Sequence, residues 1–332
     1  MTAQPRIASI HPPSAIEGGR VTIEGSDLIA DEQLPLVHVG ATPAQVLHAS
    51  SASVSVMVPA GTDGGRMPIR LGPATGETAF LEIGRPVATG LHQVDNPVVD
   101  AEGSLYVTYS GARGERSPVS VFRVRRDGFR EPFVTGITNA TSLAFAPDGR
   151  LYVSSRFEGA IYCVTEDGAF DTVASDLGVA CGLAFSPDGT LYVGDRSGTV
   201  FRVASTGKAS AFATLPASVA AYHLAWGPDD ALYVTGPTLA SYDSVYRIGL
   251  TGKIDLVNST FGRPQGLAFD AHGSLYVVEA LAGLTGLYRV DESGRVTRVL
   301  AARSLVGIAF DPFGGVIVAS NDTAYRLDSV LG

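Results

Sequence analysis

The feature that most constrains this chain is a phrase that returns about every forty residues. Residues 181–203 read CGLAFSPDGTLYVGDRSGTVFRV, and close variants such as SLAFAPDGRLYVSS and GLAFDAHGSLYVVE occur elsewhere in the chain. Self-similarity at this period is typical of propellers and solenoids, in which each repeat packs against its neighbours. The turn position marks each copy, at Gly103, Gly149, Gly189, Asp230, Gly273 and Gly314.

Each copy holds four short β-rich runs and no helical period. In the copy that begins at Cys181 the runs are GLAF, TLYVGD, TVFRVAS and KASAFATL, separated by turn signals. In the PDG turn the proline presets φ, the aspartate caps the turn and the glycine takes the left-handed position. Four strands in each of six copies predict a six-bladed β-propeller over residues 85–332. The last copy has no fourth strand, so we expect residues 85–91 to complete its blade and close the ring.

Residues 4–84 follow a different pattern. Short alternating runs such as RVTIEG, LVHVG and SVSVMV are separated by proline and glycine turns, and the forty-residue repeat is absent. This pattern is typical of a small β-sandwich. The sequence therefore predicts an all-β protein with two domains. A small immunoglobulin-like β-sandwich at 4–84 precedes a six-bladed β-propeller with four-stranded blades at 85–332.

The N-terminal segment resembles the IPT/TIG immunoglobulin-like domain. The resemblance covers the whole segment and includes the stretches VHVGATPAQV and VMVPAG. It implies a fold and leaves the role open, since such domains serve as spacers, dimerisation units and surface modules. The other matching positions are Pro5, Ile7, Ile10, Pro12, Gly18, Gly19, Val21, Ile23 and Gly25.

The repeated segment resembles NHL-type propellers and their relatives, the gluconolactonase and strictosidine-synthase-like families. The resemblance rests on GLAFSPDGTLYVGDRSGTVFRV and covers roughly residues 86–332. In the lactonases it implies a divalent metal in the central channel, held by carboxylate and asparagine oxygens. Gln265 and Cys181 stand where the family's asparagines would be. These two departures count against an inherited lactonase metal site.

Composition excludes several classes of function. Acidic residues outnumber basic ones, 33 to 24, and a net charge of −9 argues against nucleic acid as a partner. This balance and the few lysines also disfavour an NHL-like RNA-binding role. No run approaches the roughly 20 apolar residues of a membrane helix. The N-terminus lacks a basic segment followed by an apolar run, so a cytoplasmic location is expected and export stays open. The two cysteines, Cys163 and Cys181, are expected to be free thiols.

A functional site is expected on one face of the propeller. The start of each first strand and the end of each second strand lie on the same side of the ring, and the residues there vary between copies. His223 is the candidate catalytic base or ligand, expected at the channel mouth with Asn96 across from it. Its alternative role is that of a buried, hydrogen-bonded polar group. The candidate ligand-binding residues are Asn96, Tyr222, Arg263 and Gln265, with Arg263 either anchoring an anion or pairing with Glu279.

Three oxygen-bearing residues on this face are candidate metal ligands: Asn139, Asp195 and Glu279. A calcium-like ion needs six to eight oxygen ligands, so these side chains would have to converge and water molecules would have to supply the remaining ligands. The alternative is that each only caps its own loop. One histidine on the face excludes a three-histidine zinc site.

Two functions remain open from the sequence. The first is a binding protein that uses the variable channel face for a small molecule or a protein. The alternative is a metal-dependent, gluconolactonase-like hydrolase acting on a lactone or ester, with His223 or a carboxylate as base. The GxSxG motif of serine hydrolases is absent from the sequence. The oligomeric state and the role of the sandwich are not indicated.

Overall fold

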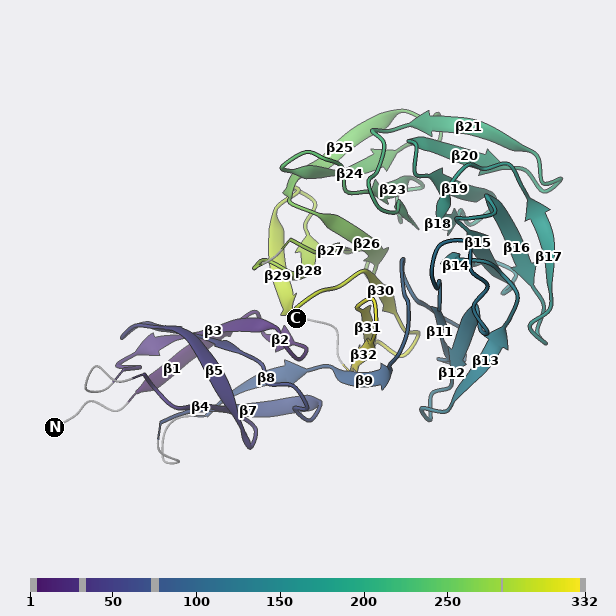
Figure 1. The fold of residues 1–332 in the computed structure, drawn as a ribbon. Coiled ribbons are helices and arrows are strands. Elements are labelled where there is room, and N and C mark those ends of the chain that lie inside the picture. Colours follow the sequence, from purple (N-terminus) through teal and green to yellow (C-terminus); the bar gives the residue numbers. More distant parts are fainter. Residues whose placement is uncertain (1–4, 30–33, 73–77, 282, 329–332) are drawn as a thin grey trace.

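The computed structural model describes residues 5–29, 34–72, 78–281 and 283–328. These residues form strands and connecting loops, and no described helix is long and apolar enough to cross a membrane. Figure 1 shows the N-terminal domain beside a ring of radially arranged sheets. The all-β class and the propeller arrangement predicted from the repeats are confirmed.

The N-terminal domain packs its strands around a core of small aliphatic residues. Val21, Ile23, Val54, Val56 and Ile69 are fully buried in this core. They alternate with more exposed residues along their strands, as expected where only one face of a sheet is covered. The strands are β1 (Arg6–His11), β2 (Ser14–Ala15), β3 (Arg20–Ser26), β4 (Val37–Val39), β5 (Thr42–Ala49), β6 (Ser53–Met57), β7 (Gly65–Leu71) and β8 (Ala79–Ile83).

Five sheets of the ring are separate and four-stranded, with antiparallel neighbours. The first three run in sequence order: β10 (Val98–Val99), β11 (Leu105–Thr108), β12 (Val121–Val124) and β13 (Arg130–Val134); β14 (Ala140–Phe145), β15 (Leu151–Ser155), β16 (Ala160–Val164) and β17 (Phe170–Ala174); β18 (Ala180–Phe185), β19 (Leu191–Asp195), β20 (Thr199–Val203) and β21 (Ala209–Thr214). The fourth contains β22 (His223–Trp226), β23 (Leu232–Thr235), β24 (Asp243–Ile248) and β25 (Ile254–Phe261).

The fifth separate sheet joins the two ends of the propeller. It contains β30 (Gly307–Phe310), β31 (Val316–Ala319), β32 (Ala324–Leu327) and β9 (Arg85–Ala88). Strand β9 pairs antiparallel with β32, with Ala88 opposite Ala324. The prediction that the segment from residue 85 supplies the missing outer strand is therefore confirmed.

The remaining four strands correct the prediction of six separate blades. Strands β26 (Pro264–Phe269), β27 (Leu275–Glu279), β28 (Gly286–Val290) and β29 (Val296–Ala301) keep the same order as the other sheets. However, β2 pairs in parallel with both β29 and β8, which makes one twelve-stranded sheet with the N-terminal domain. Ser14 lies opposite Leu300 and Ala15 opposite Ala301. The two-residue strand β2 carries no sequence pattern, so this continuity was not predicted.

The first strands line the centre of the ring. Strands β10, β14, β18, β22, β26 and β30 contact one another in a closed cycle. Close approach at the centre explains why glycine recurs at the front of the repeated phrase. A Cβ on Gly266 would lie 2.1 Å from Asn96 Oδ1, and a Cβ on Gly307 would lie 2.7 Å from the Asp95 carbonyl oxygen. The leading position is therefore glycine where the backbone or a side chain of another repeat approaches it closely, as at Gly266 and Gly307.

Candidate ligand-binding face

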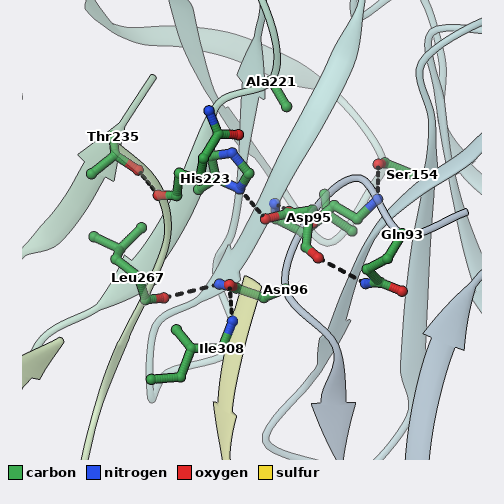
Figure 2. Close-up of polar contacts among 12 residues, drawn as sticks. Gln93, Asp95, Asn96, Ser154, Ala221, His223, Thr235, Leu267 and Ile308 are labelled. Atoms are coloured by element: carbon green, nitrogen blue, oxygen red, sulfur yellow. Dashed lines mark hydrogen bonds and ion pairs between the residues drawn. The ribbon is translucent and has the colours of Figure 1, made fainter. Parts of the chain in front are cut away.

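The centre of the ring is occupied by a histidine–aspartate pair. His223 Nδ1, on β22, lies 2.5 Å from Asp95 Oδ1, which belongs to the segment before β10 (Figure 2). Both side chains are buried, so this contact lies in a nearly water-free setting. Within the described residues, His223 Nε2 has no hydrogen-bond partner.

Two neighbouring side chains fix the Asp95 segment. Gln93 Nε2 donates to the Asp95 carbonyl oxygen at 2.7 Å, while Gln93 Oε1 accepts from the Thr108 backbone N–H at 2.8 Å. Asn96 Nδ2 donates to the Leu267 carbonyl at 2.9 Å, and Asn96 Oδ1 accepts from the Ile308 N–H at 3.0 Å (Figure 2). Asn96 thus ties β26 to β30, and its amide is already engaged by the protein.

This geometry corrects the expected placement of His223. We expected the imidazole to open at the channel mouth with Asn96 across from it, but the ring is completely buried. Its partner from across the ring is Asp95, the residue before Asn96. The His223–Asp95 pair thus fills the axis of the ring where β22 begins. A ligand at the end of the axis would contact the surrounding loops and not this pair.

Tyr222 and Gln265, two of the residues predicted to bind ligand, lie inside the protein. Tyr222 packs among β19, β22 and β23, and its hydroxyl donates to the Pro216 carbonyl. Burial raises the pKa of the Tyr222 phenol. Gln265 is largely buried on β26, and its carbonyl accepts from Thr235 Oγ1 at 2.5 Å.

Arg263 is exposed on the predicted face. Its backbone N–H donates to Glu279 Oε1 at 2.8 Å, so the expected contact with Glu279 is made by the main chain. No ion pair involves the Arg263 guanidinium among the described residues. This side chain therefore stays available to a ligand.

The three predicted metal ligands do not converge. Asp195 Oδ1 accepts from the Val179 N–H at 2.8 Å, and Glu279 Oε2 accepts from the Gly262 N–H at 2.6 Å. The Asn139 amide holds the loop after β11, accepting from the Gly114 N–H at 2.7 Å and donating to the Ser110 carbonyl at 2.5 Å. In the described part of the chain, no three His, Cys, Asp or Glu side chains are grouped to hold a metal. These residues do not fit the metal implied by the lactonase resemblance, and each caps a loop instead.

The arginines beside the second strands were missed by the sequence reasoning. Arg156 directly follows β15, Arg196 directly follows β19, and Arg113 lies in the loop between β11 and β12. Arg156 and Arg196 end the stretches SSR and GDR, one residue beyond the position that was compared between copies. Burial lowers the pKa of the half-buried Arg156 guanidinium, and the charges of Arg196 and Arg113 lower it further. Burial and the charge of Arg156 also lower the pKa of His92.

Loop contacts hold these arginines on one side of the ring. The loop that carries Arg113 is fixed by Asn139, and a Cβ on Gly114 would lie 3.0 Å from the ring of Phe157, the neighbour of Arg156. The Arg196 N–H donates to the Val179 carbonyl at 3.1 Å. Over the ranges that the structure describes, no carboxylate forms an ion pair with these three guanidinium groups. We call the side of the ring that carries the starts of the first strands and the loops between second and third strands, including these arginines, the channel face.

The opposite face contains a groove of about 1320 Å³ beneath the PDG turns of the β10–β21 sheets. Two arginines of the groove are paired: Arg123 Nε donates to Glu131 at 2.7 Å, and Arg150 Nε donates to Asp148 at 2.8 Å. Arg113, Arg156 and Arg196, which form no ion pair with any described residue, lie on the channel face, on the side of the ring opposite this groove. A partner would have to compete with existing ion pairs in the groove, whereas the channel face offers free guanidinium groups.

Comparisons with known proteins agree with this architecture. Residues 5–79 match the IPT/TIG domain model, and no curated protein matches the sequence. An auxiliary nutrient binding protein from Bacteroides ovatus is 14% identical, with 98% of both chains covered and a TM-score of 0.57. A gluconolactonase from Xanthomonas campestris is 16% identical, with 90% of this chain and 99% of that chain covered and a TM-score of 0.62.

A catalytically inactive histidine-to-alanine form of virginiamycin B lyase from Staphylococcus aureus is also similar. It is 14% identical, with 90% of this chain and all of that chain covered, and its TM-score is 0.54. At these identities the likeness concerns the fold. The molecule is thus a β-propeller protein with an N-terminal IPT/TIG domain, and its structural neighbours include both nutrient-binding proteins and gluconolactonase-like enzymes.

Proposed function

We propose that the protein is a binding protein whose channel face takes an anionic partner. The observation that carries this proposal is the group of Arg113, Arg156 and Arg196, gathered without a paired carboxylate among the described residues of an acidic chain. Arg156 is half-buried, and the exposed Arg113 and Arg196 add like charge beside it, so a bound anion would stabilise its charged form. The arginine guanidinium also binds carboxylate and phosphate groups through bidentate hydrogen bonds.

The comparisons support a binding role without naming a ligand. Proteins described as auxiliary nutrient binding proteins share the two-domain architecture over nearly the whole chain. The structure adds two features that fit such a role: a centre filled by buried side chains, and a face whose Arg113, Arg156 and Arg196 form no ion pair with any described residue. Neither feature requires a reaction.

Calorimetric titration with carboxylates and phosphate esters tests the proposal. Each of Arg156→Ala and Arg196→Ala should weaken binding about tenfold or more, the usual effect of losing a charge-assisted hydrogen bond. Arg295→Ala is the matched control, because Arg295 is exposed in the turn between β28 and β29 on the other side of the ring. The proposal would be refuted if Arg156→Ala and Arg196→Ala left the affinity unchanged, or if Arg295→Ala weakened binding as much as they do.

A hydrolase is the second candidate, favoured by one observation. Asp95 orients the His223 ring through Nδ1 and leaves Nε2 without a partner within the described residues, which is the arrangement of a general base. Reaction at Nε2 would require the loops above the buried ring to open. Turnover of lactones and esters by the wild type, lost in His223→Ala and kept in His272→Ala, would support this candidate. Equal turnover in both variants would exclude His223 as the base.

A further inference from the structure

Large apolar side chains stand out from the channel face. Leu239 and Tyr242, between β23 and β24, are 93% and 67% exposed, and Leu284, between β27 and β28, is 54% exposed. Phe157, between β15 and β16, is 53% exposed beside Arg156. These loops occupy the same position in their repeats as the loops of Arg113, Arg156 and Arg196. The repeat geometry therefore places the apolar groups and the cations on one side of the ring.

The loops that present these apolar side chains are held by specific contacts. The Thr238 N–H donates to both carboxylate oxygens of Asp243 at 3.0 Å, and the Thr238 hydroxyl donates to Asp243 Oδ1 at 2.6 Å. Thr238 Oγ1 also accepts from the Ala240 N–H. The Leu284 N–H donates to the Leu281 carbonyl at 3.0 Å. Leu239 is thus presented by a hydrogen-bonded turn. Because the backbone of this turn is already hydrogen-bonded, a partner that covers Leu239 has less loop ordering to impose.

The distribution of cations points to the kind of partner. The two lysines of the chain, Lys208 and Lys253, lie in turns between third and fourth strands, on the side opposite the channel face. The channel face combines arginine with leucine, tyrosine and phenylalanine. Arginine and aromatic residues are enriched at protein interfaces, whereas lysine is depleted there. The buried His223–Asp95 pair fills the axis below, which favours a partner that lies across the face.

We infer that the channel face binds a protein segment carrying acidic and apolar side chains. Its carboxylates meet Arg156 and Arg196, and its apolar side chains cover Leu239, Tyr242 and Leu284. The inference rests on the proposed anion-binding function and names the class of partner. The arginines follow β11, β15 and β19, and the leucines and the tyrosine follow β23 and β27, so a partner that covers both groups has to extend across neighbouring repeats of the ring.

A random-peptide display library, selected on the full chain, provides the probe. Selection should enrich peptides rich in Asp or Glu together with Leu, Phe or Tyr. Fluorescence polarisation should show the best peptide binding about tenfold more weakly to Arg156→Ala and to Leu239→Ser, as expected for interface hot spots. Arg295→Ala and Leu256→Ser are the controls, since Leu256 is 60% exposed on the outer strand β25. Both controls should bind like the wild type.

The outcomes separate this inference from the proposed function. If small carboxylates bind in an Arg156-dependent way but Leu239→Ser and Tyr242→Ser leave peptide binding unchanged, the inference fails and the proposed function stands. If neither peptides nor small acids depend on Arg156, both fail. Sedimentation showing a concentration-dependent dimer that Leu239→Ser abolishes would identify a second copy as the occupant and overturn the inference.

Discussion

Asp95 and His223 approach from opposite parts of the repeat ring to within 2.5 Å, although 128 positions separate them in sequence. Both side chains are buried, so removing one leaves the other without its partner in a low-dielectric centre. We predict that His223→Ala lowers the free energy of unfolding by about 3–5 kcal/mol, the usual range for breaking a buried pair. Denaturant unfolding measures this loss. His272→Ala, at an exposed turn, should change stability by under about 0.5 kcal/mol.

A double-mutant cycle sharpens this first prediction. Asp95→Asn and His223→Ala should be less than additive when combined, because both remove the same contact. Additive losses would show that the two side chains act independently, and would contradict a cross-ring role for the pair.

The close approach at Gly266 supports a second prediction. A methyl group there would lie 2.1 Å from Asn96 Oδ1 and 2.7 Å from Gly307 Cα, so Gly266→Ala should cost about 1–3 kcal/mol. Gly249→Ala is a suitable control, because its nearest neighbours lie 3.8 Å or more from the added carbon. Thermal unfolding of both variants provides the comparison. A Gly266→Ala protein as stable as Gly249→Ala would mean that Asn96 does not need its present position.

Local chemistry explains what the sequence could predict. The repeat of turn residues located the strands, and Asp230, which replaces the turn glycine, adopts φ +55° as its left-handed position requires. The missing fourth strand after Leu327 located β9, because an unpaired sheet edge needs a partner. These features depend on a few adjacent residues and on ring closure.

Long-range side-chain choices could not be predicted from the same patterns. Asp95 and His223 occupy neighbouring, not equivalent, positions of their repeats, so aligning copies paired His223 with Asn96 instead. Asp195 and Glu279 were expected to bind a metal, yet each accepts hydrogen bonds from loop N–H groups. A carboxylate can bind a metal or accept hydrogen bonds from backbone N–H groups. Only the position of the nearby backbone decides which of the two it does. Arg156 and Arg196 were overlooked because a single residue past a strand end carries no periodic signal.

The domain junction gives a third prediction. Ile16 comes from the N-terminal domain but is buried in the cluster of β27–β32, with Val299 and Leu305. Its N–H donates to the Ala301 carbonyl at 2.9 Å. Ile16→Ala should therefore destabilise the propeller by about 2–5 kcal/mol, as other buried aliphatic truncations do. Melting followed by tryptophan fluorescence reports on the propeller, since Trp226 lies on β22. A shift seen by far-ultraviolet dichroism but not by Trp226 would contradict coupled unfolding.

The Asn139 contacts predict how the Arg113 loop behaves. Asn139→Ala removes the acceptor for the Gly114 N–H and the donor to the Ser110 and Ala112 carbonyls. The loop should open more often, so trypsin should cleave after Arg113 several-fold faster than in the wild type. Mass spectrometry of timed digests identifies the cut. Cleavage at Arg295 should be unchanged, and equal rates at Arg113 in both proteins would show that Asn139 does not hold the loop.

The two cysteines support the last prediction. Both are free, as expected from the sequence, but their settings differ. Cys181 is buried at the start of β18, where burial and the nearby Asp95 charge raise its pKa to about 12. The thiolate is the reactive form, so at pH 8 Cys181 is almost entirely protonated as well as shielded. Cys163, half-buried on β16, is accessible to reagent.

A thiol reagent at pH 8 should therefore modify one cysteine rapidly in the native protein and two after unfolding without reductant. Cys163→Ser should abolish the rapid phase, and rapid labelling that persists in this variant would show that Cys181 is exposed.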